Sequence, residues 1–196
     1  MLIQGMISMS FPVLAQKSFM EEIHTFQEEL NEEFSDPKTS PLTKDDLKKF
    51  KALPFYSADS TFRVNAKFVR TENQTPFIMP TTTSRQPVYE KYGEAHFTLM
   101  GKNIVLTIYQ SHDLRKTEEY KDYLFLPFTD LTNGLETYGG GRYIGLTIPP
   151  GEEIIIDFNK AYNPYCAYNP KYSCPLVPRE NHIELAIEAG VKKYGH

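Results

Sequence analysis

The sequence has few cysteines, with only Cys166 and Cys174 among its 196 residues. This number excludes a scaffold held together by many disulfides, and it excludes a zinc site built from four cysteines. Basic residues are also in deficit, since 21 Lys and Arg against 25 Asp and Glu give a net charge of −4. Nucleic acid is therefore not expected as a partner, because phosphate binding requires a basic surface.

Common catalytic motifs are missing as well. The sequence contains no His-Glu-x-x-His, no Gly-x-Ser-x-Gly and no P-loop, and no motif in it predicts a cofactor. Aromatic residues, by contrast, are plentiful, and 13 Phe and 13 Tyr are enough to bury a sizeable core. The length suits one folded domain, or one domain with a small appendage.

Residues 1–16 have no charged side chain and form a largely apolar run. Val13 and Ala15 occupy the −3 and −1 positions of a cleavage site that would precede Gln16. We therefore predict that residues 1–16 are the remnant of a signal peptide and that the protein is periplasmic or secreted. The alternative is a cytoplasmic protein whose first residues belong to the fold. The run is shorter than the roughly 20 residues of a membrane-spanning helix, so no stable membrane anchor is expected.

Residues 17–52 are predicted to form a helical segment that packs on the domain. Apolar residues recur there at spacings of four, three, four and four, which predicts an amphipathic helix from Lys17 to Phe34. Thr43 and Asp46 have the spacing of a capping box, and Leu42 and Leu47 that of a hydrophobic staple. A second, short helix is therefore expected to begin after Thr43.

Residues 53–196 are predicted to form a single antiparallel β domain. The hydrophobic period changes to two from Phe62 onward, and the best hairpin takes Gly101-Lys102 as its turn, so that Phe97 faces Leu106 and His96 faces Thr107. Further strands are expected at 123–128, 142–148, 153–158 and 182–188, with Pro127 at an edge or bulge. We predict a mainly β fold, an antiparallel β-sandwich or distorted barrel with one or two N-terminal α-helices.

Polar and aromatic residues are concentrated in the second half of the chain. If Ile148 pairs with Glu153 across the intervening turn, Arg142 and Asp157 become diagonal neighbours on one face of the sheet. A ligand site and a buried structural pair are both open interpretations of this contact. The candidate ligand-binding residues are Tyr138, Arg142, Asp157, Asn159, Asn163, Tyr165, Asn181 and His96.

A tyrosine-rich loop lies within this half and has two interpretations. It contains Tyr162, Tyr165, Tyr168 and Tyr172. These rings are either a stacking platform for a sugar or a similar flat ligand, or they pin a long coil to the sheet. The Asn-Pro pairs at Asn163 and Asn169 also suit turns, because Asn bonds its own backbone readily.

Three stretches of this half together resemble a known family. They are the Thr-Tyr-Gly-Gly-Gly-Arg-Tyr stretch ending at Tyr143, the Asp-Phe-Asn-Lys-Ala-Tyr-Asn-Pro-Tyr-Cys stretch ending at Cys166, and the Cys-Pro-Leu-Val-Pro-Arg-Glu-Asn stretch ending at Asn181. They closely resemble the domain-of-unknown-function 1684 family, and the resemblance runs from about Phe19 to Val191. That family has no established activity, so the resemblance implies relatedness and no particular function.

Cys166 and Cys174 leave three interpretations open. A disulfide, which we favour, would close a short loop, contribute roughly 2–3 kcal/mol and fit an exported protein. A metal site would need two more ligands, for which His96, His112 and His182 are candidates. A cysteine nucleophile would need a histidine within hydrogen-bond reach.

Two classes of function follow from these residues. The first is an exported β domain that binds a small polar molecule or a protein partner at the face carrying Arg142, Asp157 and the tyrosine-rich loop. The second is a hydrolase-type enzyme that uses Asp157 or Cys166 with His96. The missing catalytic motifs favour the first class.

Overall fold

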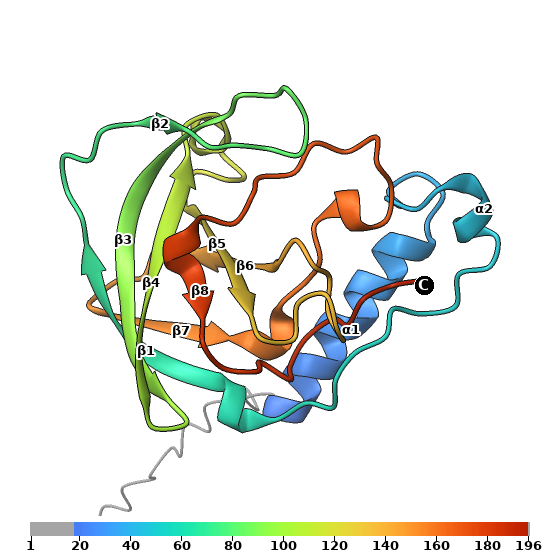
Figure 1. The fold of residues 1–196 in the computed structure, drawn as a ribbon, viewed down its shortest axis with the longest axis horizontal. Coiled ribbons are helices and arrows are strands. Elements are labelled where there is room, and N and C mark those ends of the chain that lie inside the picture. Colours follow the sequence, from blue (N-terminus) through green and yellow to red (C-terminus); the bar gives the residue numbers. More distant parts are fainter. Residues whose placement is uncertain (1–17, 196) are drawn as a thin grey trace, which may run out of the picture.

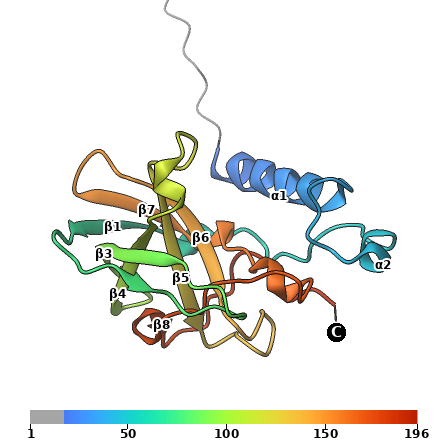
Figure 2. The same ribbon diagram turned by 90° about the horizontal axis from the view of Figure 1, so that it is seen from above.

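The computed structural model describes residues 18–195, and Figures 1 and 2 show their arrangement. The predicted signal-peptide remnant, residues 1–16, lies outside the described residues. In the part of the chain that is described, no helix has the length and apolar character needed to cross a membrane.

One mostly antiparallel sheet forms the body of the molecule and curls into a half-barrel (Figure 1). Its main strands run in the order β6-β5-β4-β3-β1-β7, while β2 pairs with β3 and β8 pairs in parallel with β5. The strands are β1 (Arg63–Arg70), β2 (Phe77–Ile78), β3 (Val88–Leu99), β4 (Lys102–Ser111), β5 (Tyr123–Asp130), β6 (Arg142–Thr147), β7 (Glu153–Asp157) and β8 (His182–Ile183). The prediction of a mainly antiparallel β fold with N-terminal helix is confirmed.

Two helices precede the sheet, α1 (Phe19–Ser35) and α2 (Lys44–Leu47). Ser18 and Glu21 form a capping box at the start of α1, and the Thr43 side chain accepts from the Asp46 amide at the start of α2. Figure 2 shows α1 lying beside the sheet. Phe34 anchors the end of α1 in an apolar cluster with Leu42, Leu53, Tyr168 and Val191.

Strand β5 is buried on both faces, and this separates two apolar clusters. Leu124, Leu126 and Phe128 belong to the main core of the sheet. Phe125 alternates with them and therefore points to the opposite face, where it joins a second cluster. That cluster also contains Met79, Tyr89, Tyr109 and Tyr143. A strand with one solvent-facing side would not create this second aromatic surface.

The hairpin of β3 and β4 has the predicted apolar face but a different register. Its turn is Met100-Gly101, with φ of 48° and 76°, so Leu99 pairs with Lys102 and Phe97 faces Ile104. The predicted turn at Gly101-Lys102 is wrong, because a type I′ turn needs positive φ at both central residues and Gly101 fills the second position. The shift is two residues, which keeps each side chain on its face, and His96 faces Val105 in place of Thr107.

The predicted pairing of β6 with β7 is also wrong. Strand β6 pairs with β5 and β7 pairs with β1, at opposite ends of the strand order. Arg142 lies opposite Phe128, and Asp157 lies opposite Arg63. Pro149 and Pro150 follow β6 and lack the amide hydrogens that would extend a hairpin ladder.

Pro127 lies inside β5 and between two neighbouring strands, contrary to the predicted edge or bulge. The side chain of Asn181 takes part in the bonding at this point: its Nδ2 donates to the carbonyls of Pro127 (2.7 Å) and Thr107 (2.8 Å), and its Oδ1 accepts from the Thr107 amide (2.8 Å). The amide therefore links β4 to β5 beside a proline that has no N–H to donate.

The predicted strand over 182–188 is shortened to β8, which contains only His182 and Ile183. Ile187 and Ala189 are nevertheless fully buried in the main core. The alternating apolar residues of this segment are therefore buried without pairing as a regular strand. Side-chain and loop contacts hold the segment in place.

Candidate ligand-binding site

Arg142 is fully buried and holds the C-terminal segment against the sheet. Its Nη2 donates to Asp130 Oδ2 and to the Ile187 carbonyl, both at 2.8 Å, and its Nη1 donates to the Ala189 carbonyl. Neither partner of the Arg142–Asp130 pair has an exposed side-chain atom. The predicted contact with Asp157 is wrong, because that residue lies on β7 and Arg142 on β6. With no exposed surface, the guanidinium offers nothing for a ligand to touch.

Asp157 and Asn159 form a second buried hydrogen-bonded cluster, which fixes the chain around Asp59. Asp157 Oδ1 accepts from the Asn159 amide (3.0 Å) and from Asn159 Nδ2 (2.8 Å). Asn159 in turn exchanges two hydrogen bonds of 2.9 Å with the backbone of Asp59. Arg63 Nη1 lies 3.9 Å from the other Asp157 oxygen. Asp157 Oδ1 and the Asn159 amide are therefore satisfied by local structure, whereas Asp157 Oδ2 has no hydrogen-bond partner among the described residues.

His96 lies apart from both residues with which it was expected to act. Its Nε2 is 3.0 Å from Glu94 Oε2. His96 on β3 and Asp157 on β7 both lie opposite residues of β1, His96 opposite Lys67 and Asp157 opposite Arg63. His96 and Asp157 are therefore two strands apart and offset by four positions along β1. Ordinary sheet spacings make that separation about 16 Å. Among the described residues, no histidine is bonded to Cys166. The structure therefore does not assemble the catalytic pair that the hydrolase interpretation requires.

Cys166 and Cys174 lie together beside Tyr138. The Cys166 amide donates to Cys174 Sγ at 3.2 Å, and the Tyr138 hydroxyl lies 3.9 Å from Cys166 Sγ. The hydrogen bond from the Cys174 thiol lowers the pKa of Cys166 to about 6, with a smaller contribution from Tyr138, whereas the pKa of Cys174 is raised. Both cysteines are free thiols here, and the disulfide stays a prediction. Within residues 18–195 no group of three or more His, Cys, Asp or Glu is placed to hold a metal ion.

The remaining candidates, Asn163 and Tyr165, line a pocket of about 570 Å³. Its wall comes from α1, from the aromatic face of β3, β5 and β6, and from the loop of residues 162–175. Figure 1 shows α1 (blue) and the orange coil after β7 on the same side of the sheet. We call this space the tyrosine pocket, after its ring-bearing lining residues Phe26, Phe34, Tyr89, Tyr120, Tyr123, Phe125, Tyr143, Tyr162, Tyr165 and Tyr172.

The rings of the tyrosine pocket meet mostly edge to face. Phe125 and Tyr143 have centroids 4.7 Å apart at 75°, and Tyr143 and Tyr162 have centroids 6.0 Å apart at 90°. Tyr165 and Tyr172 extend the set, 5.2 Å apart at 60°. Because successive rings are steeply inclined to each other, the wall presents both ring faces and ring edges.

Asn163 lines the tyrosine pocket, but its side-chain amide is turned to other contacts. Asn163 is 1% exposed, and its Nδ2 donates to the Lys192 carbonyl (2.9 Å) and to the Tyr168 hydroxyl (3.2 Å). The other amide atom, Oδ1, is fully enclosed and has no hydrogen-bond partner among the described residues. The amide therefore fixes the loop at residue 163, and the accessible surface of the pocket comes mainly from its rings.

The tyrosine hydroxyls of this wall are neutral donors and acceptors. Burial raises the pKa of Tyr162 to about 12, and burial likewise raises the pKa values of Tyr89, Tyr123 and Tyr143. Their hydroxyls therefore stay protonated well above neutral pH. All four have hydrogen-bond partners within the protein: the Tyr143 hydroxyl donates to the Pro175 carbonyl, the hydroxyls of Tyr123 and Tyr162 lie 3.3 Å apart, and Tyr89 bonds to Ser111.

Glu33 is a charged residue of this site that the sequence did not reveal. It lies on the acidic side of α1, where a row of glutamates is typical of a solvated face. In the structure its carboxylate accepts from the Tyr165 hydroxyl, 132 positions away. Tyr89 and Tyr143 were also missed, although the alternation of aromatic and aliphatic residues in β5 signals a strand with two buried faces.

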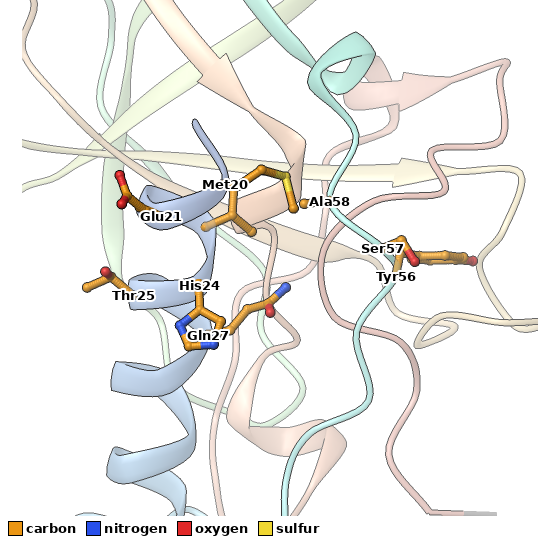
Figure 3. Close-up of a pocket in the computed structure, with 9 residues that line it drawn as sticks. Met20, Glu21, His24, Thr25, Gln27, Tyr56, Ser57 and Ala58 are labelled. Carbon is orange, nitrogen blue, oxygen red and sulfur yellow. The ribbon is translucent and has the colours of Figure 1, made fainter. Parts of the chain in front are cut away.

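A second hollow lies between α1 and the chain at residues 56–58, with a volume of about 560 Å³. Figure 3 shows Met20 reaching toward Ala58, with His24 and Gln27 on the helix beside them. His24 Nδ1 lies 3.1 Å from Glu28 on the same helix. Tyr56 and the imidazole of His24 supply the aromatic rings among the residues that line it. The tyrosine pocket is therefore the better candidate for a small ligand, because rings supply most of the contact area that such ligands use.

Comparison with known proteins places the chain in a family. The family described as protein of unknown function, DUF1684, matches residues 48–192. The chain belongs to the DUF1684 family. This match includes all three stretches on which the sequence resemblance rests, and it begins at Lys48, after α1.

One solved structure similar to this family member comes from Haloarcula marismortui. It is the solution NMR structure of an uncharacterized protein, 31% identical, with a TM-score of 0.68, and it covers 87% of this chain and 92% of that chain. No protein with a curated description matches the chain significantly. The comparisons support the fold and the relationship, and the arguments about function rest on the site itself.

Proposed function

We propose that this protein binds a small organic ligand with an aromatic or apolar body in the tyrosine pocket. The observation that carries the proposal is a space of about 570 Å³ that is lined by ten aromatic side chains and one carboxylate, Glu33. Ligand sites combine a mainly apolar wall with a few placed polar atoms, and this pocket has that composition.

A binding role is favoured over catalysis by the positions of the polar residues. Arg142, Asp157, Asn159 and Asn181 are occupied in buried contacts that hold strands and loops together. His96 pairs with Glu94 and is distant from Asp157. The tyrosine pocket offers rings, the carboxylate of Glu33 and the side chains of Ser173 and Cys174.

The test uses 2-phenylethanol, a neutral aromatic probe, and saturation-transfer NMR on the full chain. We expect transfer from the wild-type protein and its loss in Leu30→Trp, because the larger side chain fills part of the pocket that Leu30 lines. Val105→Trp is the matched control, because Val105 is 46% exposed on β4 and outside the pocket. Melting temperatures of both variants check that they fold.

Transfer that persists in Leu30→Trp would contradict the proposal, since the probe would then bind elsewhere. Absence of transfer from the wild-type protein would contradict it too. Transfer lost equally in Leu30→Trp and Val105→Trp would point to a nonspecific effect of added tryptophan, and this would also count against the pocket.

A further inference from the structure

We infer that the tyrosine pocket selects organic cations: ligands in which an ammonium group is carried on an aromatic or apolar body. This inference rests on the proposed function and specifies the class of ligand. It is carried by three features of the pocket: its charge, its rings and its hydrogen-bonding atoms.

The charge of the lining is negative. Glu33 is its single charged residue, and no Lys, Arg or His is among the lining residues. The Glu33 side chain is held by the Tyr165 hydroxyl, which accounts for one hydrogen bond to the carboxylate. A carboxylate accepts several hydrogen bonds, so capacity for a ligand's ammonium group remains. A ligand anion would meet this carboxylate with no lining cation to compensate.

The rings supply the second feature. Ring faces carry negative electrostatic potential, and sets of inclined aromatic rings are the usual way in which proteins hold substituted ammonium groups. The ring planes of Tyr165 and Tyr172 are inclined at 60° beside Glu33, and the ring centroids of Phe34 and Tyr165 are 6.2 Å apart. Rings and carboxylate thus surround the same part of the pocket.

Hydrogen bonding gives the third feature. The Glu33 carboxylate of the lining is an acceptor, and it already accepts from the Tyr165 hydroxyl. An ammonium group has only donors, so it complements this carboxylate. A carboxylate or phosphate ligand has only acceptors, and it would gain no hydrogen bond from Glu33.

Two basic side chains lie near the pocket without lining it. Lys171 places its ammonium 4.8 Å from the centroid of the Tyr172 ring, so that ring already faces a cation within the protein. Arg85 donates to the Ser173 carbonyl at 3.2 Å. Both groups bond to the loop itself and are not lining residues, although the charge of Arg85 also acts on Tyr89 and Cys174 in the lining.

The experiment compares three probes of similar size that differ in charge: 2-phenylethylamine, 2-phenylethanol and phenylacetate. Dissociation constants are measured by NMR titration against the full chain. We expect the amine to bind at least about tenfold more tightly than the alcohol, and phenylacetate to bind most weakly. Glu33→Gln is expected to weaken the binding of the amine about tenfold and to leave the binding of 2-phenylethanol unchanged.

Glu29→Gln is the matched control, because Glu29 is an exposed glutamate on the same helix and does not line the pocket. It removes one negative charge from α1 without touching the site, so amine binding should be as in the wild type. If both variants weaken amine binding equally, the effect comes from the overall charge of α1 and not from Glu33 in the pocket. That result would overturn the inference.

Other outcomes separate the inference from the proposed function. Equal binding of the amine and the alcohol, both lost in Leu30→Trp, would overturn cation selection and leave the pocket as a ligand site. Preference for phenylacetate would overturn it too. If none of the three probes binds the wild-type protein, the proposed function fails together with the inference.

Discussion

At the scale of single residues, the most constrained charge is the guanidinium of Arg142. Burial lowers its pKa, and the neighbouring Asp130 carboxylate opposes that effect. A buried ion pair contributes little net free energy, because desolvation offsets the attraction, but removal of one partner leaves an uncompensated charge. Arg142 is therefore best understood as the residue that ties β5, β6 and the chain at Ile187 and Ala189 together.

Asp130→Asn should lower the free energy of unfolding by about 3–5 kcal/mol, since Arg142 would be left buried without its anion. Urea denaturation measures this change. Glu118→Gln is the control, because the Lys121–Glu118 pair is exposed and such pairs contribute under about 1 kcal/mol. Equal, small effects of the two substitutions would contradict the structural role of the Arg142–Asp130 pair.

Cys166 should be the more reactive thiol of the reduced protein. Its pKa is lowered to about 6 by the Cys174 thiol, so the thiolate fraction rises as pH increases through 6 and is nearly complete above pH 7. The rate of iodoacetamide alkylation at Cys166 should follow that curve. In Cys174→Ala the donor is lost and the midpoint should move toward the ordinary value of about 8.5. An unchanged midpoint would show that Cys174 does not set this pKa.

At the scale of elements, the junction of β4 and β5 depends on one side chain from a distant loop. Asn181 supplies three hydrogen bonds there, beside a proline that supplies no N–H. A proline inside a strand with neighbours on both sides is unusual, and the bridging amide is the physical reason that it is accommodated here.

Asn181→Ala should destabilise the protein by about 2–4 kcal/mol, because the Thr107 amide and two carbonyls lose their buried partner. Thermal or urea unfolding gives the value. In Asn169→Ala, the lost bond is an exposed turn contact to the Lys171 amide, and the change should stay below about 1 kcal/mol. A loss of the same size in both variants would mean that the bridge contributes no more than an ordinary turn.

Element boundaries could be predicted where the determinants are local. The cap at Thr43 acts within one helical turn, and the period of two identifies β1, β3 and β4 from neighbouring residues. Pairing of β6 and β7 could not be predicted, because it depends on which distant strand buries each apolar face best. The predicted position of the β3–β4 turn was wrong by one residue, because the turn requires positive φ at two successive residues, which Met100 and Gly101 supply.

The candidate site was predictable only in part, for the same reason. Asn163 and Tyr165 lie in a segment whose turns and rings are visible in the sequence, and they do line the tyrosine pocket. Glu33 is hidden among other glutamates, and its role depends on a tyrosine that lies 132 positions away. Arg142 and Asp157 were predicted as ligand-binding residues because of their charge, but both belong to buried hydrogen-bonded clusters that hold the fold together.

At the scale of the whole molecule, export and thiol state form one linked prediction. If residues 1–16 direct secretion, the exported protein should begin at or near Gln16 and carry a Cys166–Cys174 disulfide, formed from sulfurs that already lie side by side. Intact mass with alkylation, before and after reduction, measures both features. Free thiols on an exported protein would contradict the disulfide, and an uncleaved N-terminus would contradict the signal peptide.

The molecule as a whole places a ring-lined pocket where α1, the sheet and the tyrosine-rich loop meet, and we propose that a ligand binds there. NMR of the full chain with ¹³C-labelled tyrosine rings, titrated with 2-phenylethylamine, tests this binding. We expect shifts at the rings of Tyr143, Tyr162, Tyr165 and Tyr172, and none at Tyr92, which lies on β3 under Arg70. Shifts confined to tyrosines outside the pocket, or no shifts at all, would contradict it.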